Sequence, residues 1–201
     1  MADPKSFVIV GAGPGLGAAL ARRFAQEGWS IGLIALRQDV IDACIVDLEP
    51  LGARTAGAQA DVTDRAALDR AFTSIVDVLG APDVVVYNAS IYQPEGALEL
   101  SVDALRLALD IHVVGALNAA QSAVPPMRQA GRGVLVFTVN NLALAPEAMS
   151  TALSIGKGAQ RNLALSLARE LDGTGIHVGI VTICGPIKAG TFYDPDRLAD
   201  V

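Results

Sequence analysis

Aromatic and basic residues are scarce in this chain. Its 201 residues include only 1 Trp, 3 Tyr and 5 Phe, so the core has to be built from Ala, Val, Leu and Ile. Such a composition is typical of parallel sheets covered by helices. Lys and Arg together number 15 against 21 Asp and Glu, which gives a net charge of -6. Because nucleic acid requires a net basic face, this balance argues against a nucleic-acid partner.

Cysteines and long apolar runs are also few. Cys44 and Cys184 lie far apart with no metal-ligand spacing, so we expect reduced, ordinary side chains and no metal site. No apolar run reaches the roughly 18 residues that a membrane-spanning helix needs. The amino terminus places an acid before a base, ahead of a short apolar stretch, which does not fit a signal peptide. These features predict a cytoplasmic protein without a membrane partner.

What the chain does contain is an alternation of short β-branched runs with longer segments of helical period. With 52% hydrophobic and 18% charged residues, we expect one domain over residues 1–201. The expected strands are 7–10, 31–36, 55–60, 83–87, 134–139 and 176–183. The expected helices are 16–26, 40–51, 64–79, 101–123 (ended by Pro125 and Pro126) and 150–171. This rhythm predicts an α/β, Rossmann-type, doubly wound parallel sheet with helices on both faces.

Between the first strand and the first helix stand four glycines at alternate positions, from Gly11 to Gly17. Glycines at such a turn let the backbone approach a pyrophosphate, and the helix amino terminus offers it free N–H groups and a positive dipole end. A turn that merely needs glycine is the alternative. The position directly after an apolar strand favours a dinucleotide site.

The end of the second strand is expected to contact the adenosine ribose. A carboxylate there would accept the 2′-hydroxyl of NAD(H), and an arginine would accommodate the 2′-phosphate of NADP(H). Arg37 comes first, and the first acid, Asp39, follows two residues later. The order favours NADP(H), with NAD(H) as the alternative.

Together with further landmarks, the glycine spacing resembles the short-chain dehydrogenase/reductase family over essentially the whole chain. The landmarks are Asp61-Val62, Tyr87-Asn88-Ala89-Ser90, and Lys157 ahead of Ala168-Arg-Glu-Leu171. The resemblance implies cofactor contacts at Gly11, Gly15, Leu16, Gly17, Arg37, Asp61, Val62, Asn88, Ala89 and Lys157. It also implies a small-molecule substrate and a homodimer or homotetramer assembled through the fourth and fifth helices.

The catalytic positions depart from the family pattern. Leu153 stands at the tyrosine position four residues before Lys157, Asn140 at the serine position, and His112 at the asparagine position. Hydride transfer to a carbonyl creates an alkoxide that needs a proton donor. Leucine cannot donate a proton, and losing a positioned acid usually costs about 10²- to 10⁴-fold in rate. Asn140 can still donate a hydrogen bond to a substrate oxygen.

Other groups could supply the missing proton. His112 is one candidate, although a histidine on an apolar helix is more often a core residue. Tyr92, just beyond the fourth strand, is another candidate, although such a residue is more often a loop aromatic that covers the core edge. Ser154 carries an unactivated hydroxyl and is a poor acid, and the sequence does not place Tyr193. The resemblance also implies a lid helix and a seventh strand after Ile187. We expect both to be missing from this sequence.

Two functions follow from this pattern. The first is an NADP(H)-dependent oxidoreductase with a substituted acid/base, in which Lys157, Asn140 and His112 are the candidate catalytic residues. The second is a catalytically inactive NAD(P)-binding sensor or partner subunit, suggested by the altered positions. A structural subunit that binds no nucleotide is a third possibility, which the glycine loop disfavours.

Overall fold

A computed structural model describes residues 5–200, so part of the amino-terminal segment, residues 1–4, and residue 201 lie outside it. Its strands form one parallel sheet in the order β3-β2-β1-β4-β5-β6. Their bounds are Ser6–Val10 (β1), Ser30–Ala35 (β2), Thr55–Gln59 (β3), Val84–Tyr87 (β4), Gly133–Asn140 (β5) and Ile176–Ile183 (β6). The strand order reverses between β1 and β4, which is where such folds bind ligands beyond the strands' carboxyl ends.

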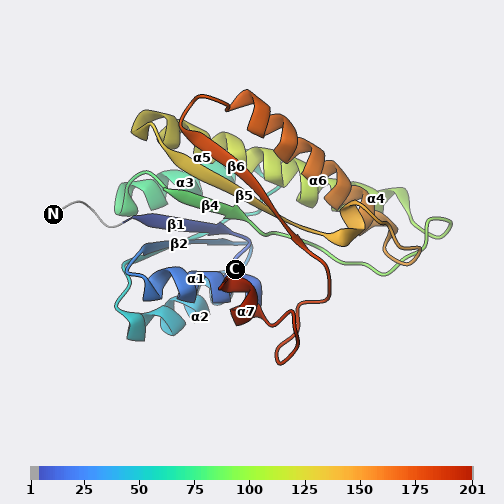
Figure 1. Cartoon of the computed structure of the whole chain (residues 1–201), viewed down its shortest axis with the longest axis horizontal. Helices are drawn as coiled ribbons and strands as arrows, with labels where there is room; N and C mark the ends of the chain where they lie inside the picture. Colours follow the sequence, from blue (N-terminus) through green and yellow to red (C-terminus); the bar gives the residue numbers. More distant parts are fainter. Residues whose placement is uncertain (1–4, 201) are drawn as a thin grey trace.

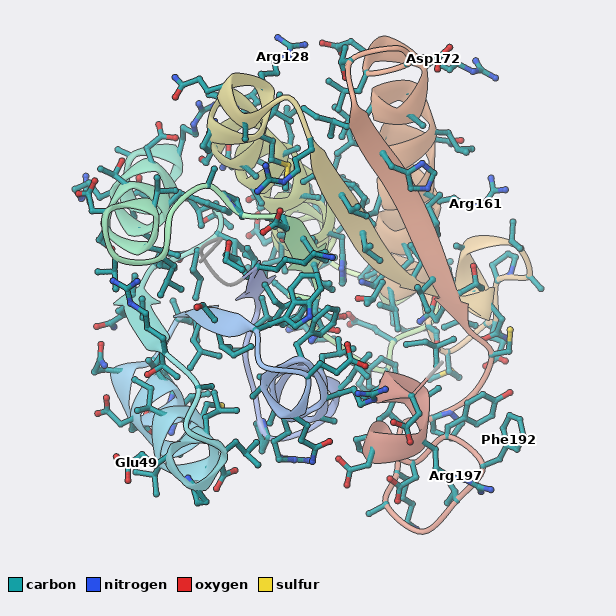
Figure 2. The ribbon with its side chains drawn as sticks, turned by 60° about the vertical axis from the view of Figure 1, so that its left-hand side comes forward. Glu49, Arg128, Arg161, Asp172, Phe192 and Arg197 are labelled. Atoms are coloured by element: carbon teal, nitrogen blue, oxygen red, sulfur yellow. The ribbon has the colours of Figure 1, made fainter. Side chains whose placement is uncertain are left out.

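Helices cover both faces of this sheet, as the sequence predicts (Figure 1). The helices are Leu16–Gln26 (α1), Gln38–Leu48 (α2), Arg65–Leu79 (α3), Val102–Leu109 (α4), Gly115–Ala130 (α5), Thr151–Glu170 (α6) and Pro195–Ala199 (α7). One layer holds α1, α2 and α7, and the other holds α3, α5 and α6 (Figure 1). Figure 2 shows Glu49, just after α2, on the opposite side of the molecule from Arg128 of α5.

The two layers bury alternate side chains of the same strands. In β1, Val8 and Val10 pack in the cluster that includes α3 and α5, whereas Phe7 and Ile9 pack in the cluster with α1 and α2. This alternation is the period of two that a strand imposes on its side chains. The central strands β1, β2 and β4 are therefore almost continuously apolar, because both of their faces are covered.

Helix α5 corrects one sequence prediction, because it continues through Pro125 and Pro126 to Ala130. Proline removes a backbone donor and usually ends a helix. Here Met127, which is fully buried, holds the last turn in the core, and the helix stops only at Gly131 with a left-handed φ of 69°. Tertiary packing of that turn thus outweighs the local cost of the two prolines.

Helices α4 and α5 are joined by a π-helical turn, Asp110–Val114. The resulting stretch Val102–Ala130 is long and apolar enough to cross a membrane by length and composition, which the sequence reading did not anticipate. Half of its most apolar window is buried inside the fold. This is the burial expected of the core helix that packs on the sheet.

After β6 the chain crosses to the other layer and ends beside α1 (Figure 1). The short helix α7 was not predicted. It is tied to α1 by ion pairs between Arg22 and Asp196 (2.6 Å) and between Arg23 and Asp200 (3.0 Å). In the described residues the sheet has six strands, and β6 pairs with β5 alone.

Candidate functional site

The glycine loop forms an open cradle at the start of α1. No side chain caps this helix, and its first turn carries no acidic residue among those described. A Cβ added at Gly13 or Gly15 would meet nothing within 4 Å, so there is free space above the backbone. The helix start therefore offers its amide groups to an anion. Leu16 contributes its backbone there, since its side chain lines a cavity elsewhere.

At Gly11 and Gly17 glycine is needed because neighbouring backbone atoms leave no room for a Cβ atom. Gly11 has a φ of +92°, and a Cβ there would collide with the backbone nitrogen of Ala89. A Cβ on Gly17 would lie 3.1 Å from the carbonyl oxygen of Gly11. These contacts bring the glycine loop against the segment that follows β4, where Asn88 and Ala89 were predicted.

A chain of hydrogen bonds runs from the glycine loop into the sheet. Asn88 Nδ2 donates to the carbonyl of Gly11 at 3.1 Å, and Asn88 Oδ1 accepts a hydrogen bond from Thr138 Oγ1 at 3.1 Å. The carbonyl oxygen of Thr138 accepts in turn from Lys157 Nζ at 2.9 Å. The predicted cofactor residues Gly11, Asn88 and Lys157 are thus connected through Thr138 of β5, which the sequence did not indicate.

Lys157 is buried, with only 4% of its surface exposed, so it is not part of a solvated helix face. Besides the Thr138 carbonyl, its ammonium donates to Gln160 Oε1 at 2.9 Å. Burial lowers the pKa of Lys157 to about 7. Gln160 is fully buried as well and was not predicted. Its position three residues after Lys157, on the same helix face, is the signal that could have found it.

On the adenosine side, Arg37 lies at the N-cap of α2 and forms an exposed ion pair with Asp39. This hydrogen bond raises the pKa of Arg37 and lowers the pKa of the Asp39 carboxyl. The Arg37 Nε donates to Asp39 Oδ1 at 2.9 Å, so an anion that approaches the guanidinium meets a carboxylate already in place.

The loop after β3 carries Asp61 and Val62. Asp61 Oδ1 accepts from both the backbone nitrogen (2.9 Å) and the hydroxyl (2.8 Å) of Thr63. The carbonyl of Val62 accepts a hydrogen bond from Asn118 Nδ2 of α5 at 3.0 Å. Asn118, which the sequence reading missed, therefore fixes this loop from the helical layer beneath it.

His112 is a fully buried residue in the π-helical turn. Burial, with the nearby Lys157, lowers its pKa to about 4, so the imidazole is neutral. Its Nε2 lies 3.2 Å from the carbonyl oxygen of Ile91, which makes Nε2 the donor. Its ring packs so closely on α6 that a Cβ on Gly156 would lie 2.6 Å from it. The geometry is that of an anchor between α6 and the loop after β4.

A cavity of about 450 Å³ opens beyond the carboxyl ends of β5 and β6. Among its lining residues are Asn140, Leu153, Tyr92 and Cys184. Asn140 Oδ1 is buried and has no hydrogen-bond partner within the described part of the chain. An orphaned buried oxygen of this kind is satisfied when a ligand donor reaches it. The cavity brings together two predicted positions, Asn140 and Leu153, with the loop residue Tyr92.

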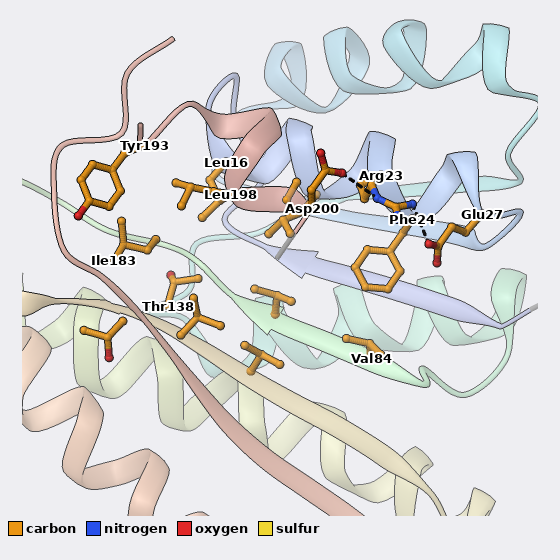
Figure 3. A pocket seen from close by; sticks show the side chains of 16 residues that line it. Leu16, Arg23, Phe24, Glu27, Val84, Thr138, Ile183, Tyr193, Leu198 and Asp200 are labelled. Atoms are coloured by element: carbon orange, nitrogen blue, oxygen red, sulfur yellow. Dashed lines mark ion pairs between the residues drawn. The ribbon is translucent and has the colours of Figure 1, made fainter. Parts of the chain in front are cut away.

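Two other candidates lie outside this cavity. Ser154 Oγ donates to the carbonyl of Ser150 at 2.8 Å, back along its own helix. Tyr193 instead lines a second cavity of about 500 Å³ between α1 and the sheet, together with Leu16 and Phe24 (Figure 3). Figure 3 also shows Arg23 at this second cavity, paired with Glu27 and Asp200.

Comparisons with known proteins agree with this geometry. The family model for short chain dehydrogenase matches residues 5–195. Meso-2,3-butanediol dehydrogenase from Serratia marcescens is 30% identical over 179 residues, covering 89% of this chain and 70% of that protein. The 1-deoxy-11-beta-hydroxypentalenate dehydrogenase of Streptomyces exfoliatus is 29% identical over 180 residues, covering 88% of this chain and 66% of that protein.

Solved structures give the same result. L-sorbose reductase from Gluconobacter frateurii, complexed with NADPH and L-sorbose, matches with a TM-score of 0.85 and 27% identity, covering 90% of this chain and 69% of that one. A short chain dehydrogenase from Mycobacterium smegmatis shares the fold, with a TM-score of 0.89 at 22% identity over 98% of this chain and 83% of that one. The match over almost all of its residues shows that this chain belongs to the short-chain dehydrogenase/reductase family of oxidoreductases.

Proposed function

We propose that this chain is an NADP(H)-dependent oxidoreductase with a substituted acid/base. The observation that carries the proposal is the uncapped start of α1, where open space lies above Gly13 and Gly15. A pyrophosphate would accept hydrogen bonds from the amides of Gly15, Leu16 and Gly17, as helix starts in dinucleotide folds do. The bound cofactor supplies the hydride, and the chain supplies binding and orientation.

The preference for NADP(H) rests on Arg37. The 2′-phosphate would compete for the guanidinium with the Asp39 carboxylate, which Arg37 already holds through two nitrogens, and the phosphate brings the larger negative charge. The solved complex of L-sorbose reductase contains NADPH, which supports the same cofactor here. Asp61 and Val62 would contact adenine, with Asn118 holding their loop in place.

In the reacting half of the site we assign roles to three residues. Lys157 would contact the nicotinamide ribose. Its position is fixed by the hydrogen bonds that connect it, through Thr138, to Asn88. Asn140 would donate a hydrogen bond from Nδ2 to a substrate carbonyl oxygen, because its amide lines the cavity, and its Oδ1, which lacks a partner among residues 5–200, could accept one from a substrate hydroxyl. His112 acts through position rather than proton transfer, since it is neutral and bound to the Ile91 carbonyl.

A second candidate function is an inactive NAD(P)-binding sensor or partner subunit. It is favoured by Leu153, an apolar side chain facing the cavity where the family has its tyrosine, and by Lys157 bonding inward to Gln160. Double replacement by Leu153→Tyr and Asn140→Ser separates the two functions. If the native protein already reduces carbonyls, the inactive sensor or partner subunit is excluded. If turnover appears only in the double variant, the inactive function is supported.

Titration calorimetry with NADPH and with NADH tests the cofactor proposal. We expect NADPH to bind more tightly, and Arg37→Gln to remove most of that difference while leaving NADH binding nearly unchanged. Arg106→Gln is the matched control, because Arg106 also forms an exposed ion pair, with Asp103 at 3.2 Å. If neither nucleotide binds, the proposal is refuted. If NADPH affinity falls equally in Arg37→Gln and Arg106→Gln, the role of Arg37 is refuted.

The remaining properties are carried over as proposals. Family members act on small molecules and are typically oligomeric, so we propose a small-molecule substrate and a homodimer or homotetramer. One NAD(P)-binding domain would span residues 1–201, in the cytoplasm, without a nucleic-acid or membrane partner. Sedimentation of the purified protein, alone and with NADPH, measures the assembly directly.

A further inference from the structure

The loop that follows β4 contributes Tyr92 to the lining of the 450 Å³ cavity that Asn140 also lines, and the loop is fastened at two points. At one end, the Ile91 carbonyl lies 3.2 Å from His112 Nε2. At the other end, Glu95 forms a bridge with Ser150, and its carbonyl accepts a hydrogen bond from the Thr151 nitrogen at 3.4 Å. Tyr92 lies between these two attachments in the sequence, so both restrain the backbone that carries this lining residue.

The cavity contains few groups that could release a proton to a substrate oxygen. Leu153 has none, and the amides of Asn140 and Asn141 donate hydrogen bonds without losing a proton. Ser150 carries an unactivated aliphatic hydroxyl, and Glu147 carries an exposed carboxyl group that only accepts hydrogen bonds when it is ionised. Cys184 directs its thiol toward the Thr182 carbonyl, 3.8 Å away. The phenol of Tyr92 is the one aromatic hydroxyl among the described lining residues. At 58% exposure, it can also regain a proton from solvent.

Resting on the proposed function, we propose that Tyr92 is the proton donor that replaces the missing helix tyrosine, and that His112 is its positioning residue. In the reduction, the carbonyl carbon accepts a hydride from the dihydronicotinamide, and the electron pair of the C–O π bond moves to oxygen. The Tyr92 hydroxyl transfers its proton to that oxygen, which gives the alcohol. The phenolate then takes a proton from water, so one proton is consumed per turnover.

His112 fits this role because of its charge state as well as its contact. Burial keeps the imidazole neutral, so Nε2 donates to Ile91 while Nδ1 carries a lone pair. The fully buried ring cannot reach solvent to exchange protons itself. Its contribution is to fix the backbone one residue before Tyr92.

The first test measures Tyr92 without any turnover. The chain has only three tyrosines, so protein labelled with ¹³Cζ-tyrosine gives three signals, and Tyr92→Phe and Tyr193→Phe assign two of them. In the protein without nucleotide, Asn140→Ala should shift the Tyr92 signal and leave Tyr193, in the other cavity, unchanged. A Tyr92 signal insensitive to Asn140→Ala overturns the inference.

The second test measures reduction of a panel of aldehydes, ketones and vicinal diones with NADPH. Tyr92→Phe should lower kcat by about 10²- to 10⁴-fold while KM and the Kd for NADPH change less than about twofold, and Tyr193→Phe should leave all three unchanged. Adding Leu153→Tyr to Tyr92→Phe should restore turnover, because it returns a phenol to the same cavity. His112→Asn, which keeps a donor for the Ile91 carbonyl, should retain more kcat than His112→Ala.

The outcomes distinguish failure of the proposed cofactor binding from failure of the proposed role of Tyr92. If NADPH does not bind, the proposed function fails. If NADPH binds but Tyr92→Phe turns over like the native protein, or the native protein reduces no member of the panel, the inference about Tyr92 fails while nucleotide binding stands. Equal losses in kcat for the two His112 variants overturn the positioning role.

Discussion

The buried Lys157 makes stability depend on pH in a direction that can be worked out in advance. Its pKa in the folded protein is about 7, below the ordinary value of 10.5, because burial disfavours the ammonium. Between these two values the unfolded chain holds a proton that the folded chain has released. Since the unfolded state binds more protons, the free energy of unfolding rises with pH across this window.

The magnitude follows from the proton difference. Each pH unit over which one extra proton is bound corresponds to about 1.4 kcal/mol. From about pH 7.5 to about pH 9.5 the difference is close to one proton, so Lys157 should add about 2.5 kcal/mol to the free energy of unfolding. The lysine is 4% exposed, so solvent screening reduces this effect little.

Urea unfolding of the native protein and of Lys157→Met at both pH values isolates the effect. Methionine keeps the length of the side chain and does not titrate. Subtracting its curve removes contributions from other groups, such as Cys44, whose thiol has its pKa raised by burial. We expect the native protein to gain about 2.5 kcal/mol relative to Lys157→Met between the two pH values. A difference that does not change with pH would show that Lys157 stays charged in the fold, and would refute the reasoning.

Three further predictions concern packing and capping. Gly11→Ala combines a strained φ with a collision against Ala89, so we expect a loss of about 2–5 kcal/mol and no measurable NADPH binding by calorimetry; Gly13→Ala, where space is open, should unfold within about 1 kcal/mol of the native protein. Gly156→Ala should destabilise by about 1–3 kcal/mol in thermal unfolding because its methyl meets the His112 ring, and adding His112→Ala should lessen that cost; strictly additive losses would contradict this packing. Asp64→Ala removes the side chain that accepts from the Ala67 nitrogen at 3.0 Å and should cost about 1 kcal/mol in urea unfolding, as capping losses usually do; an unchanged midpoint would contradict the cap.

The sequence predicted the fold because local pattern and global architecture agree here. The bounds of α1 match the prediction, since apolar residues recur at helical spacing and glycines mark its start. The extension of α5 past Pro126 was missed, because burial of Met127 depends on elements far away in the chain. Local sequence rules account for the hydrogen bonds that the two prolines remove. They cannot account for core contacts of Met127 with residues that are distant in the sequence.

For the candidate site, the sequence indicated the glycine loop and Lys157 but did not indicate the residues that support them. Glycines and the Lys157 position follow from spacing, which a single chain displays. Thr138, Gln160 and Asn118 are ordinary polar residues whose importance comes from burial and from partners about 3 to 56 positions away. Gln160 is marked only by its place three residues after Lys157, and nothing in the sequence marks Thr138 or Asn118, because polar residues of these types usually lie on the surface.

The hydrogen-bond chain through Asn88 and Thr138 has a consequence for how this protein can diverge. Each of these side chains satisfies a neighbour on another element, so losing one member leaves a polar atom at the neighbouring strand without its partner. Replacements should therefore be tolerated in concert rather than singly. A homologue that alters Asn88 is expected to carry an accompanying change at Thr138, and the pair should show strong non-additivity in a double-mutant cycle.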